Sequence, residues 1–479
     1  MTNLDRQETL FRAAVWALAV GAFLWYMWVA CTQFASNRTF LADVGVFNVL
    51  CSGPLHGHWL RTPLAPDAPG NYFGIHFQPY LLAITPFYAI HDHTTTLLAA
   101  FSLSLGLAGV PLAFATRRLT NSRCVALGVQ TLYHTNHFLL SIHLAHHPES
   151  LAIPWIFLMF WGLVAEKRAV LIGSLLAALA VKGDFAVFLG LFWALEACRR
   201  NNRPLALTCL AICAGWWVLA LVVSHLSGAA WFAAQGMTPV SRFASMGSTK
   251  LEIALHLATH PLDVAQRIFR EPLFALIVCV TGLCLLDWRG VWAGLAAAAI
   301  FLVTDDPIIR ELQYYYSYGA FPLLMISAVR GSVVFLDINE RRALMARLLA
   351  GFLVANGVWM LMKPTRTDGL MHRPFPVSDR DRLTEEVMAL IPPDAPVAAQ
   401  FDLFPRVPNR RDLFPLREAF LDRVAYVAIN LEGRAPDLQG DERERVFARL
   451  SSSEWETVEP TPLENFLILR KAKATDPPP

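Results

Sequence analysis

Four short clusters of ionisable residues stand out because each lies beside a long apolar run. They are Asp43 with His76, His146-His147-Pro148-Glu149, Lys182-Gly183-Asp184, and Asp305-Asp306. A carboxylate placed beside a histidine can accept and return a proton. Lysine and histidine side chains stabilise negative charge. The residue types therefore point to proton transfer and to the binding of an anionic group.

Each cluster also has a structural interpretation, in which the acids cap or begin helices and the lysine reaches the membrane interface. Asp43 would cap a helix beginning at Val44, and Asp305-Asp306 would form a turn and a cap. The two interpretations make different predictions. Caps serve their own helices and are dispersed, whereas the members of a site converge on one place.

The composition predicts the kind of protein that positions these clusters. Hydrophobic residues make up 55% of the chain and charged residues 16%, and the mean hydropathy is +0.41. Soluble domains carry about 25% charged residues. The chain is therefore a multi-pass membrane protein. A net charge of +2 without a basic patch gives no indication of a nucleic-acid partner. The eight cysteines form no CxxC motif, so no metal centre or disulfide framework is indicated.

Apolar runs predict about 11 transmembrane helices, since a span needs roughly 17 to 25 apolar residues and shorter ones fit inside a bundle. The predicted spans are 12–31, 94–116, 123–143, 150–165, 169–182, 184–198, 205–226, 272–287, 290–304, 313–330 and 343–362. The short segment 80–90 contains Pro86 and is interpreted as a re-entrant or interfacial helix.

Lys and Arg are more numerous in one set of alternate loops, and such loops are cytoplasmic. This places the N-terminus inside, and it places the large first loop 32–93 and the C-terminus outside. All four clusters then lie on the outer side. Ionisable groups at membrane depth tend to mark function, so we expect a polar cavity open to the outer leaflet. The tyrosines at 314, 315, 316 and 318 fit an interfacial aromatic belt.

The composition changes after Lys363. Residues 1–363 form the predicted transmembrane bundle, and residues 364–479 a small extracytoplasmic α/β domain with a disordered end. Ser378 is expected to cap a helix that runs to Ile391. The other elements expected in this domain are strands over 397–401, 424–429 and 466–469 and a helix over 441–450.

Several sequence motifs resemble those of the bacterial and archaeal domain-of-unknown-function 2079 family. They are ADVGVFN at 42–48, GIHFQP at 74–79, HHPES at 146–150, VKGDF at 181–185, IPPDAPVAAQFDLFPRVPNRRDLF at 391–414 and VAYVAIN at 424–430. Members of this family look like GT-C glycosyltransferases, which are polytopic enzymes. The chain departs from the family pattern at Gly183, where an acid is usual, and at His146, where an aromatic residue is usual.

The resemblance implies an integral-membrane glycosyltransferase of the plasma (inner) membrane that uses a polyprenyl-phosphate-linked sugar at the outer face. Asp43 is the implied base that takes the proton of the acceptor hydroxyl. The predicted catalytic residues are Asp43, His76, His147 and Glu149, and the predicted substrate-binding residues are Lys182, Asp184 and His146. As an alternative within the same geometry, Asp43, Glu149 and a histidine would bind a divalent metal.

Two other functional classes were weighed. A transporter or lipid flippase is disfavoured, because no inverted repeat and no charge near mid-span is visible. A non-catalytic scaffold would use the basic residues Arg406, Arg410 and Arg411 to bind an anionic partner, although a solvated basic face explains them as well. The sugar, the acceptor and the oligomeric state have no recognisable sequence signal.

Overall fold

The chain is organised as two compact units. The computed structural model describes residues 3–36, 41–63, 65–198, 203–235, 242–312, 314–362, 374–400, 403–407, 409–410, 412–431, 440–458 and 466–472. The bundle unit comprises residues 1–28, 73–80 and 100–373, and the sheet unit comprises residues 29–72, 81–99 and 374–479. Each unit thus joins segments that are far apart in the sequence.

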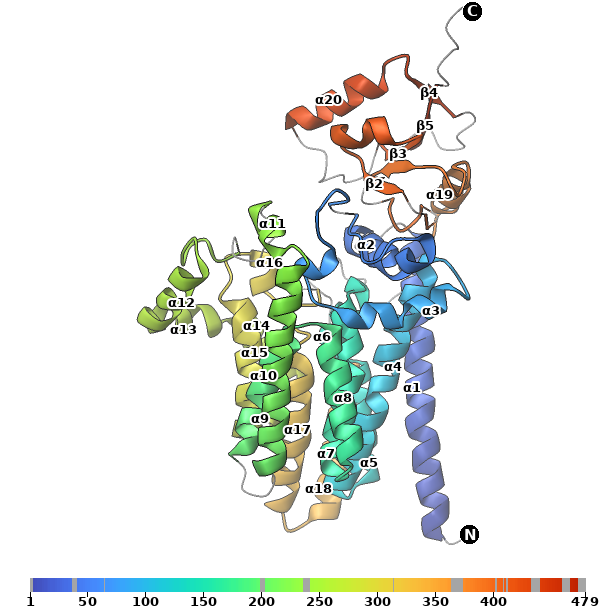
Figure 1. The fold of residues 1–479 in the computed structure, drawn as a ribbon. Helices are drawn as coiled ribbons and strands as arrows, with labels where there is room; N and C mark the ends of the chain where they lie inside the picture. The colour runs from blue at the N-terminus through green and yellow to red at the C-terminus, as the bar shows by residue number, and fades with distance from the viewer. Residues whose placement is uncertain are drawn as a thin grey trace, which may run out of the picture. The chain divides into compact units, whose positions relative to one another are not determined.

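The bundle unit consists of helices, among which α17 packs against η7 and α15. Its elements are α1 (Asn3–Ala35), η2 (Tyr72–Gly74), η3 (Pro79–Ala83), α4 (Thr94–Thr120), α5 (Arg123–His134), α6 (His137–Ala145), η4 (Pro148–Leu151), α7 (Ala152–Val164), α8 (Arg168–Val181), α9 (Phe185–Ala197), α10 (Arg203–Leu226), α11 (Ala229–Ala234), α12 (Lys250–Thr259), α13 (Pro261–Ile268), α14 (Glu271–Cys279), η7 (Leu283–Leu286), α15 (Trp288–Leu302), α16 (Pro307–Arg310), α17 (Ala320–Asp337) and α18 (Arg342–Met362). Four of these, α1, η2, η3 and α4, include residues that belong to the sheet unit. Helices α9, α10, α15 and α17 run side by side (Figure 1).

Among the described residues, five helices are long and apolar enough to cross a membrane, namely Leu4–Ala35, Thr94–Thr120, Arg203–Leu226, Ala320–Asp337 and Arg342–Met362. Shorter apolar helices accompany them at Pro148–Val164, Arg168–Val181, Phe185–Ala197 and Trp288–Leu302. Spans of this apolar character are expected of a membrane protein. Helix α17 is the most buried of these five long helices, with 72% of its residues inside the structure.

Two predicted spans are interrupted. The span predicted over 123–143 is two helices, α5 and α6, because Asn136 begins a new helix by accepting the Phe138 N–H at 3.0 Å. The span predicted over 272–287 ends as an α-helix at Cys279. Thr281 and Gly282 follow with positive φ angles of 75° and 68°, a conformation that ends an α-helix. Hydropathy continues across both breaks and therefore does not reveal them.

A buried ion cluster marks one end of the bundle. Arg330 of α17 bonds the Glu196 carboxylate of α9 at 2.6 Å and 3.0 Å and lies 3.8 Å from Asp287, which precedes α15. The last turn of α9 and the first turn of α15 therefore meet at this end. Because the two helices are antiparallel, Asp184 before α9 and Asp305 after α15 share the opposite end.

The sheet unit combines the early loop helices with the C-terminal segment. Its elements are α2 (Leu41–Ser52), η1 (Gly53–His56), α3 (Thr85–Tyr88), α19 (Asp379–Ala389), β1 (Val397–Ala399), β2 (Leu413–Pro415), η8 (Glu418–Arg423), β3 (Tyr426–Asn430), α20 (Gly440–Leu450), β4 (Trp455–Thr457) and β5 (Phe466–Lys471). The strands form one sheet in the order β2-β1-β3-β5-β4. The β2-β1-β3 pairs are parallel, and β5 runs antiparallel to both β3 and β4.

Alternating side chains of these strands build two apolar layers. Val397, Ala399 and Ile468 pack with α19 on one face, whereas Ala398 and Leu469 pack with α20 on the other. The helix predicted after Ser378 is confirmed as α19, with a capping box between Ser378 and Asp381. The helix predicted over 441–450 is α20, and the three predicted strands correspond to β1, β3 and β5.

Strands β2 and β4 were not predicted. Each contains only three residues, which is too short to show an alternating pattern. In the interfacial segment predicted over 80–90, the structure forms η3 and α3, two short helical turns.

Candidate active site

The centre of the candidate site is Glu149, whose side chain is fully buried. His147 precedes η4, Pro148 occupies its first turn, and Glu149 follows, so the local sequence begins a helix as Pro and Glu favour. The Glu149 carboxylate nevertheless contacts other side chains. Its Oε2 meets His147 Nδ1, and its Oε1 accepts a hydrogen bond from Lys182 Nζ at 2.6 Å. Glu149 therefore joins two of the clusters singled out in the sequence.

Lys182 reaches this carboxylate because α8 ends at Val181 and residue 182 is extended. The Lys182 side chain is 10% exposed, and its ammonium pairs with the buried Glu149 carboxylate. Its Nζ also lies 3.5 Å from Asp184 Oδ2. Asp184 is the N-cap residue of α9 but makes no side-chain cap hydrogen bond, and its side chain is 47% exposed.

The turn at 182–184 is tied to the GIHFQP segment through its backbone. The Gly183 N–H donates to the Phe77 carbonyl at 3.0 Å. A Cβ at position 183 would lie 3.2 Å from Ala220 Cβ in α10. Glycine thus allows α10 to approach this turn closely, which gives a packing reason for the departure from the family pattern.

His76 belongs to the same electrostatic environment. Burial, together with the nearby Lys182 and Arg242 cations, holds the pKa of His76 well below its usual 6.5. The same causes, led by burial, hold the pKa of His147 well below its usual value. Both imidazoles are therefore neutral at pH 7, and neutral His147 can donate its Nδ1–H to Glu149.

Arg242 and the tyrosines after Leu312 were not predicted as site residues. The Arg242 cation acts on both His76 and His147, and its backbone carbonyl accepts the Asp305 N–H at 2.8 Å. The Tyr315 ring stacks on His147, with ring centroids 3.7 Å apart and planes 7° apart. Of the aromatic residues expected at the interface, Tyr315 thus contributes to this cluster. A tyrosine run carries no sequence signal that separates these two roles.

His146 occupies a left-handed backbone conformation with φ of 47° at the end of α6. Its fully buried ring packs edge-on against His143. A positive φ is uncommon for residues other than glycine. The tight turn that it makes sends the chain from α6 into η4, which carries Glu149.

Asp43 is the predicted site residue that belongs to the sheet unit. Helix α2 begins at Leu41, so Asp43 lies inside its first turn rather than capping a helix that begins at Val44. Residues of the C-terminal segment pack against α2 within the sheet unit. A Cβ at Gly45 would lie 2.5 Å from Phe404 Cβ, Asn48 hydrogen-bonds Asn409, and Val49 packs in the core beneath β1.

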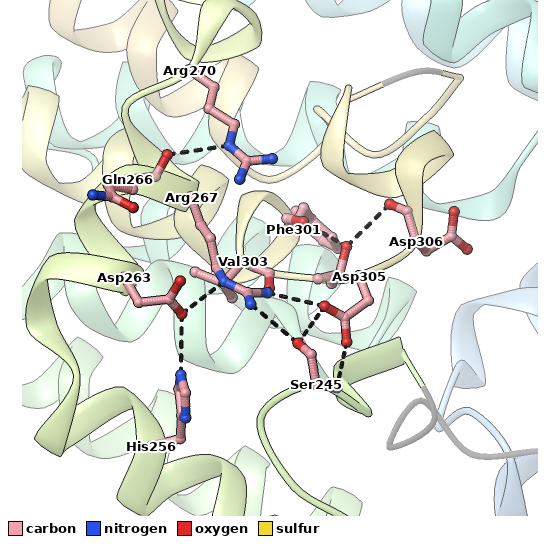
Figure 2. A network of polar contacts seen from close by, with 11 residues as sticks. Ser245, His256, Asp263, Gln266, Arg267, Arg270, Phe301, Val303, Asp305 and Asp306 are labelled. Carbon is pink, nitrogen blue, oxygen red and sulfur yellow. Dashed lines mark hydrogen bonds and ion pairs between the residues drawn. The ribbon is translucent and has the colours of Figure 1, made fainter.

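The acids at 305–306 have separate structural tasks (Figure 2). Asp306 caps α16 by accepting the Ile308 N–H at 2.9 Å, as the cap interpretation predicted. Asp305 accepts hydrogen bonds from Arg267 Nη1 at 3.0 Å and from the Ser245 N–H at 2.8 Å. These acids are therefore parts of a loop network.

Within the described part of the chain, no three His, Cys, Asp or Glu side chains gather as a metal-binding group would. Both oxygens of Glu149 are engaged, one by His147 and one by Lys182. The predicted alternative of a metal on Asp43, Glu149 and a histidine would require Glu149 to exchange one of these partners.

The whole fold has solved counterparts. ArnT from Cupriavidus metallidurans bound to undecaprenyl phosphate matches with a TM-score of 0.51 at 12% identity, over 97% of this chain and 99% of that chain. Its apo state matches with a TM-score of 0.52 at 12% identity, over 98% of each chain. The match to the apo oligosaccharyltransferase of Archaeoglobus fulgidus covers 87% of this chain and 70% of that chain, at 13% identity and a TM-score of 0.43.

No curated protein shows significant sequence similarity to the chain. The profile of the family described as "Predicted membrane protein (DUF2079)" matches residues 41–461. This range includes every motif on which the resemblance was based. The chain therefore belongs to the DUF2079 family of predicted membrane proteins.

Proposed function

We propose that this protein is an integral-membrane glycosyltransferase that uses a polyprenyl-phosphate-linked sugar at the outer face of the membrane. The observation that carries the proposal is the shared fold, over nearly the full length of both chains, with ArnT bound to undecaprenyl phosphate. The Glu149 cluster and its nearby cations supply groups suited to that chemistry.

In the proposed reaction the acceptor hydroxyl oxygen attacks the anomeric carbon of the donor sugar. The bond between that carbon and the phosphate oxygen breaks, and polyprenyl phosphate leaves with the bonding electrons. The acceptor proton passes to the Asp43 carboxylate, which the family motif implies as the base and which lies in the first turn of α2. A placed base contributes roughly 10²–10⁴ in rate.

The leaving phosphate gains negative charge and needs cations near it. Lys182 and Arg242 meet this need. Both cations lower the pKa of His76 and of His147, so both lie near the same two imidazole rings. Neutral His76 would donate a hydrogen bond to a phosphate oxygen without adding charge. Arg242 is exposed, which suits contact with a ligand arriving from the membrane.

Glu149 and His147 act as positioning residues in this proposal. Glu149 is buried and its oxygens are engaged, so its task is to fix the Lys182 ammonium and the His147 ring. Asp184 is half exposed and is the better candidate to accept a hydrogen bond from a sugar hydroxyl. His146 shapes the turn that carries both positioning residues.

The test is transfer by the purified protein in lipid nanodiscs, with a panel of radiolabelled polyprenyl-phosphate sugars and release of polyprenyl phosphate as the readout. Asp43→Asn should reduce turnover by at least about 10²-fold, the lower bound for a lost general base. Asp67→Asn is the matched control, because Asp67 is an exposed acid of the same unit that pairs with Arg423.

Unchanged turnover in Asp43→Asn would remove Asp43 from the role of base while leaving the transferase. A wild-type protein that consumes no donor of the panel, although it binds polyprenyl phosphate, would refute the transferase itself. Lys182→Met should weaken polyprenyl-phosphate binding, and equal affinity for both proteins would contradict the assignment of that cation.

A further inference from the structure

The hairpin formed by α12 and α13, residues 249–270, exposes leucine side chains and pairs an arginine with an acid of the bundle. A helix packed on a soluble protein has the opposite arrangement, with its apolar side against the protein. Thr249 and Glu252 form a capping box at its start. The helices have 10 and 8 residues, about 15 and 12 Å long at 1.5 Å per residue. Neither can cross a hydrocarbon layer of about 30 Å.

The polar side of the hairpin faces the protein (Figure 2). Arg267 Nε bonds Asp263 Oδ2 at 2.9 Å, and Arg267 Nη1 bonds Asp305 Oδ1 at 3.0 Å. The same Nη1 donates to the Val303 carbonyl at 3.2 Å, just after α15. His256 of α12 approaches Asp263 at 3.1 Å. His256 of α12 and Asp263 and Arg267 of α13 are therefore paired with one another and with Asp305.

The apolar side faces away from the protein. Leu251, Leu255, Leu262 and Phe269 are 76%, 61%, 79% and 58% exposed. Leu251 and Leu255 are four residues apart on α12, whereas Leu262 is in the first turn of α13 and Phe269, seven residues later, directly follows its end, so each pair has the spacing of one side of a helix. No residue of α13 is buried. In water this arrangement would leave large apolar side chains exposed, which is the reverse of what the hydrophobic effect favours.

Exposed apolar side chains continue into the helix that follows the hairpin. Helix α14 starts directly after the hairpin, and its Phe274 and Val278 are 54% and 56% exposed. Figure 1 shows α12 and α13 at the flank of the bundle, next to α14 and α15. The exposed Gln266 lies between Leu262 and Phe269 on the same face. One amide among leucines suits the boundary between headgroups and acyl chains.

We propose that the α12–α13 hairpin lies in the membrane interface, with its leucine face in the lipid acyl chains of the leaflet next to Asp305 and Asp184. That leaflet is the one at the end of the bundle opposite Arg330. The partner is the lipid surface itself. The Arg267–Asp305 contact then anchors the hairpin to the end of α15, and the inference does not depend on the reaction.

The test uses full-length protein in nanodiscs, with the exposed Cys124 and Cys198 replaced by serine. A bimane label is attached to Leu255→Cys or Leu262→Cys. Val218→Cys in α10, which is 58% exposed, serves as the lipid-facing control, and Glu444→Cys in α20 serves as the aqueous control. Each label is quenched in turn by acyl-brominated lipid and by iodide in the buffer.

Labels at 255 and 262 should behave as at 218, losing at least half of their fluorescence to brominated lipid and little to iodide. The label at 444 should show the opposite. Quenching of 255 and 262 by iodide and not by brominated lipid would overturn the proposal. Protection from both quenchers would also overturn it, because a protein surface would then cover the leucine face. Catalytic turnover does not enter this readout.

Discussion

The buried pair between Lys182 and Glu149 provides the most direct test of how the site is held. Nζ and Oε1 lie 2.6 Å apart, and the two side chains are 10% and 0% exposed. At an effective dielectric constant near 20, two unit charges at this separation attract by about 6 kcal/mol. Desolvation of both charges offsets much of this attraction, so the net value of the intact pair is small.

Breaking the pair from one side is a different matter. Lys182→Met leaves a carboxylate in a fully buried position, and removing one partner of a buried ion pair costs about 3–5 kcal/mol. Glu149→Gln should cost less, because Lys182 keeps the half-exposed Asp184 at 3.5 Å. The double variant should lose less than the sum of the two single losses, with a coupling of about 0.5–3 kcal/mol.

The assay is denaturant titration in mixed micelles, followed by tryptophan fluorescence, for the wild type, both single variants and the double variant. Arg445 and Glu418 provide the control cycle, because their contact is 2.8 Å long but both side chains are largely exposed. That cycle should show no resolvable coupling. Additive losses at Lys182 and Glu149, or a Lys182→Met loss no larger than that of the exposed pair, would refute the reasoning.

Three further outcomes are expected. Gly45→Ala should destabilise the protein by about 1–3 kcal/mol, because the new Cβ would lie 2.5 Å from Phe404 Cβ, whereas Gly21→Ala, with nothing within 4 Å, should be neutral or stabilising in the same thermal scan. Because His76 has a pKa well below 6.5 in the folded protein, only the unfolded chain binds its proton as the pH falls below about 6.5. The free energy of unfolding should therefore decrease as the pH falls below about 6.5. His76→Gln should weaken the pH dependence of the unfolding midpoint measured between pH 5 and 8. Incubation with a chelator should leave donor consumption unchanged, because Lys182 already neutralises Glu149, and activity restored only by added divalent metal would contradict this expectation.

The local elements were predictable where a short stretch of sequence decides them. The Ser378 capping box and the apolar periodicity of the helices are examples. The contacts among His147, Glu149 and Lys182 were also predictable, because the predicted topology puts their helix ends on the same side of the membrane. The break at Asn136 was not predictable, since one capping amide within an apolar run leaves the hydropathy unchanged.

Non-local contacts account for the remaining misses. The stacking of Tyr315 on His147 joins a residue before α7 to one after α16, and the aromatic character of Tyr315 also fitted the membrane interface. The packing of the C-terminal segment against α2 depends on pairs of residues that are far apart in the sequence, such as Asn48 and Asn409. No periodicity or spacing within either segment contains that information.

That packing has a consequence for the order of events during synthesis. Asn48 and Asn409 are 361 residues apart. At roughly 5–20 residues per second, about 20–70 s pass between the emergence of the two partners. During that interval Val49 has no β1 core to enter, so the segment bearing Asp43 matures only when the last quarter of the polypeptide has been made. A chain released early from the ribosome would thus have its transmembrane helices but lack the core against which α2 packs. We expect cellular quality control to degrade such a chain.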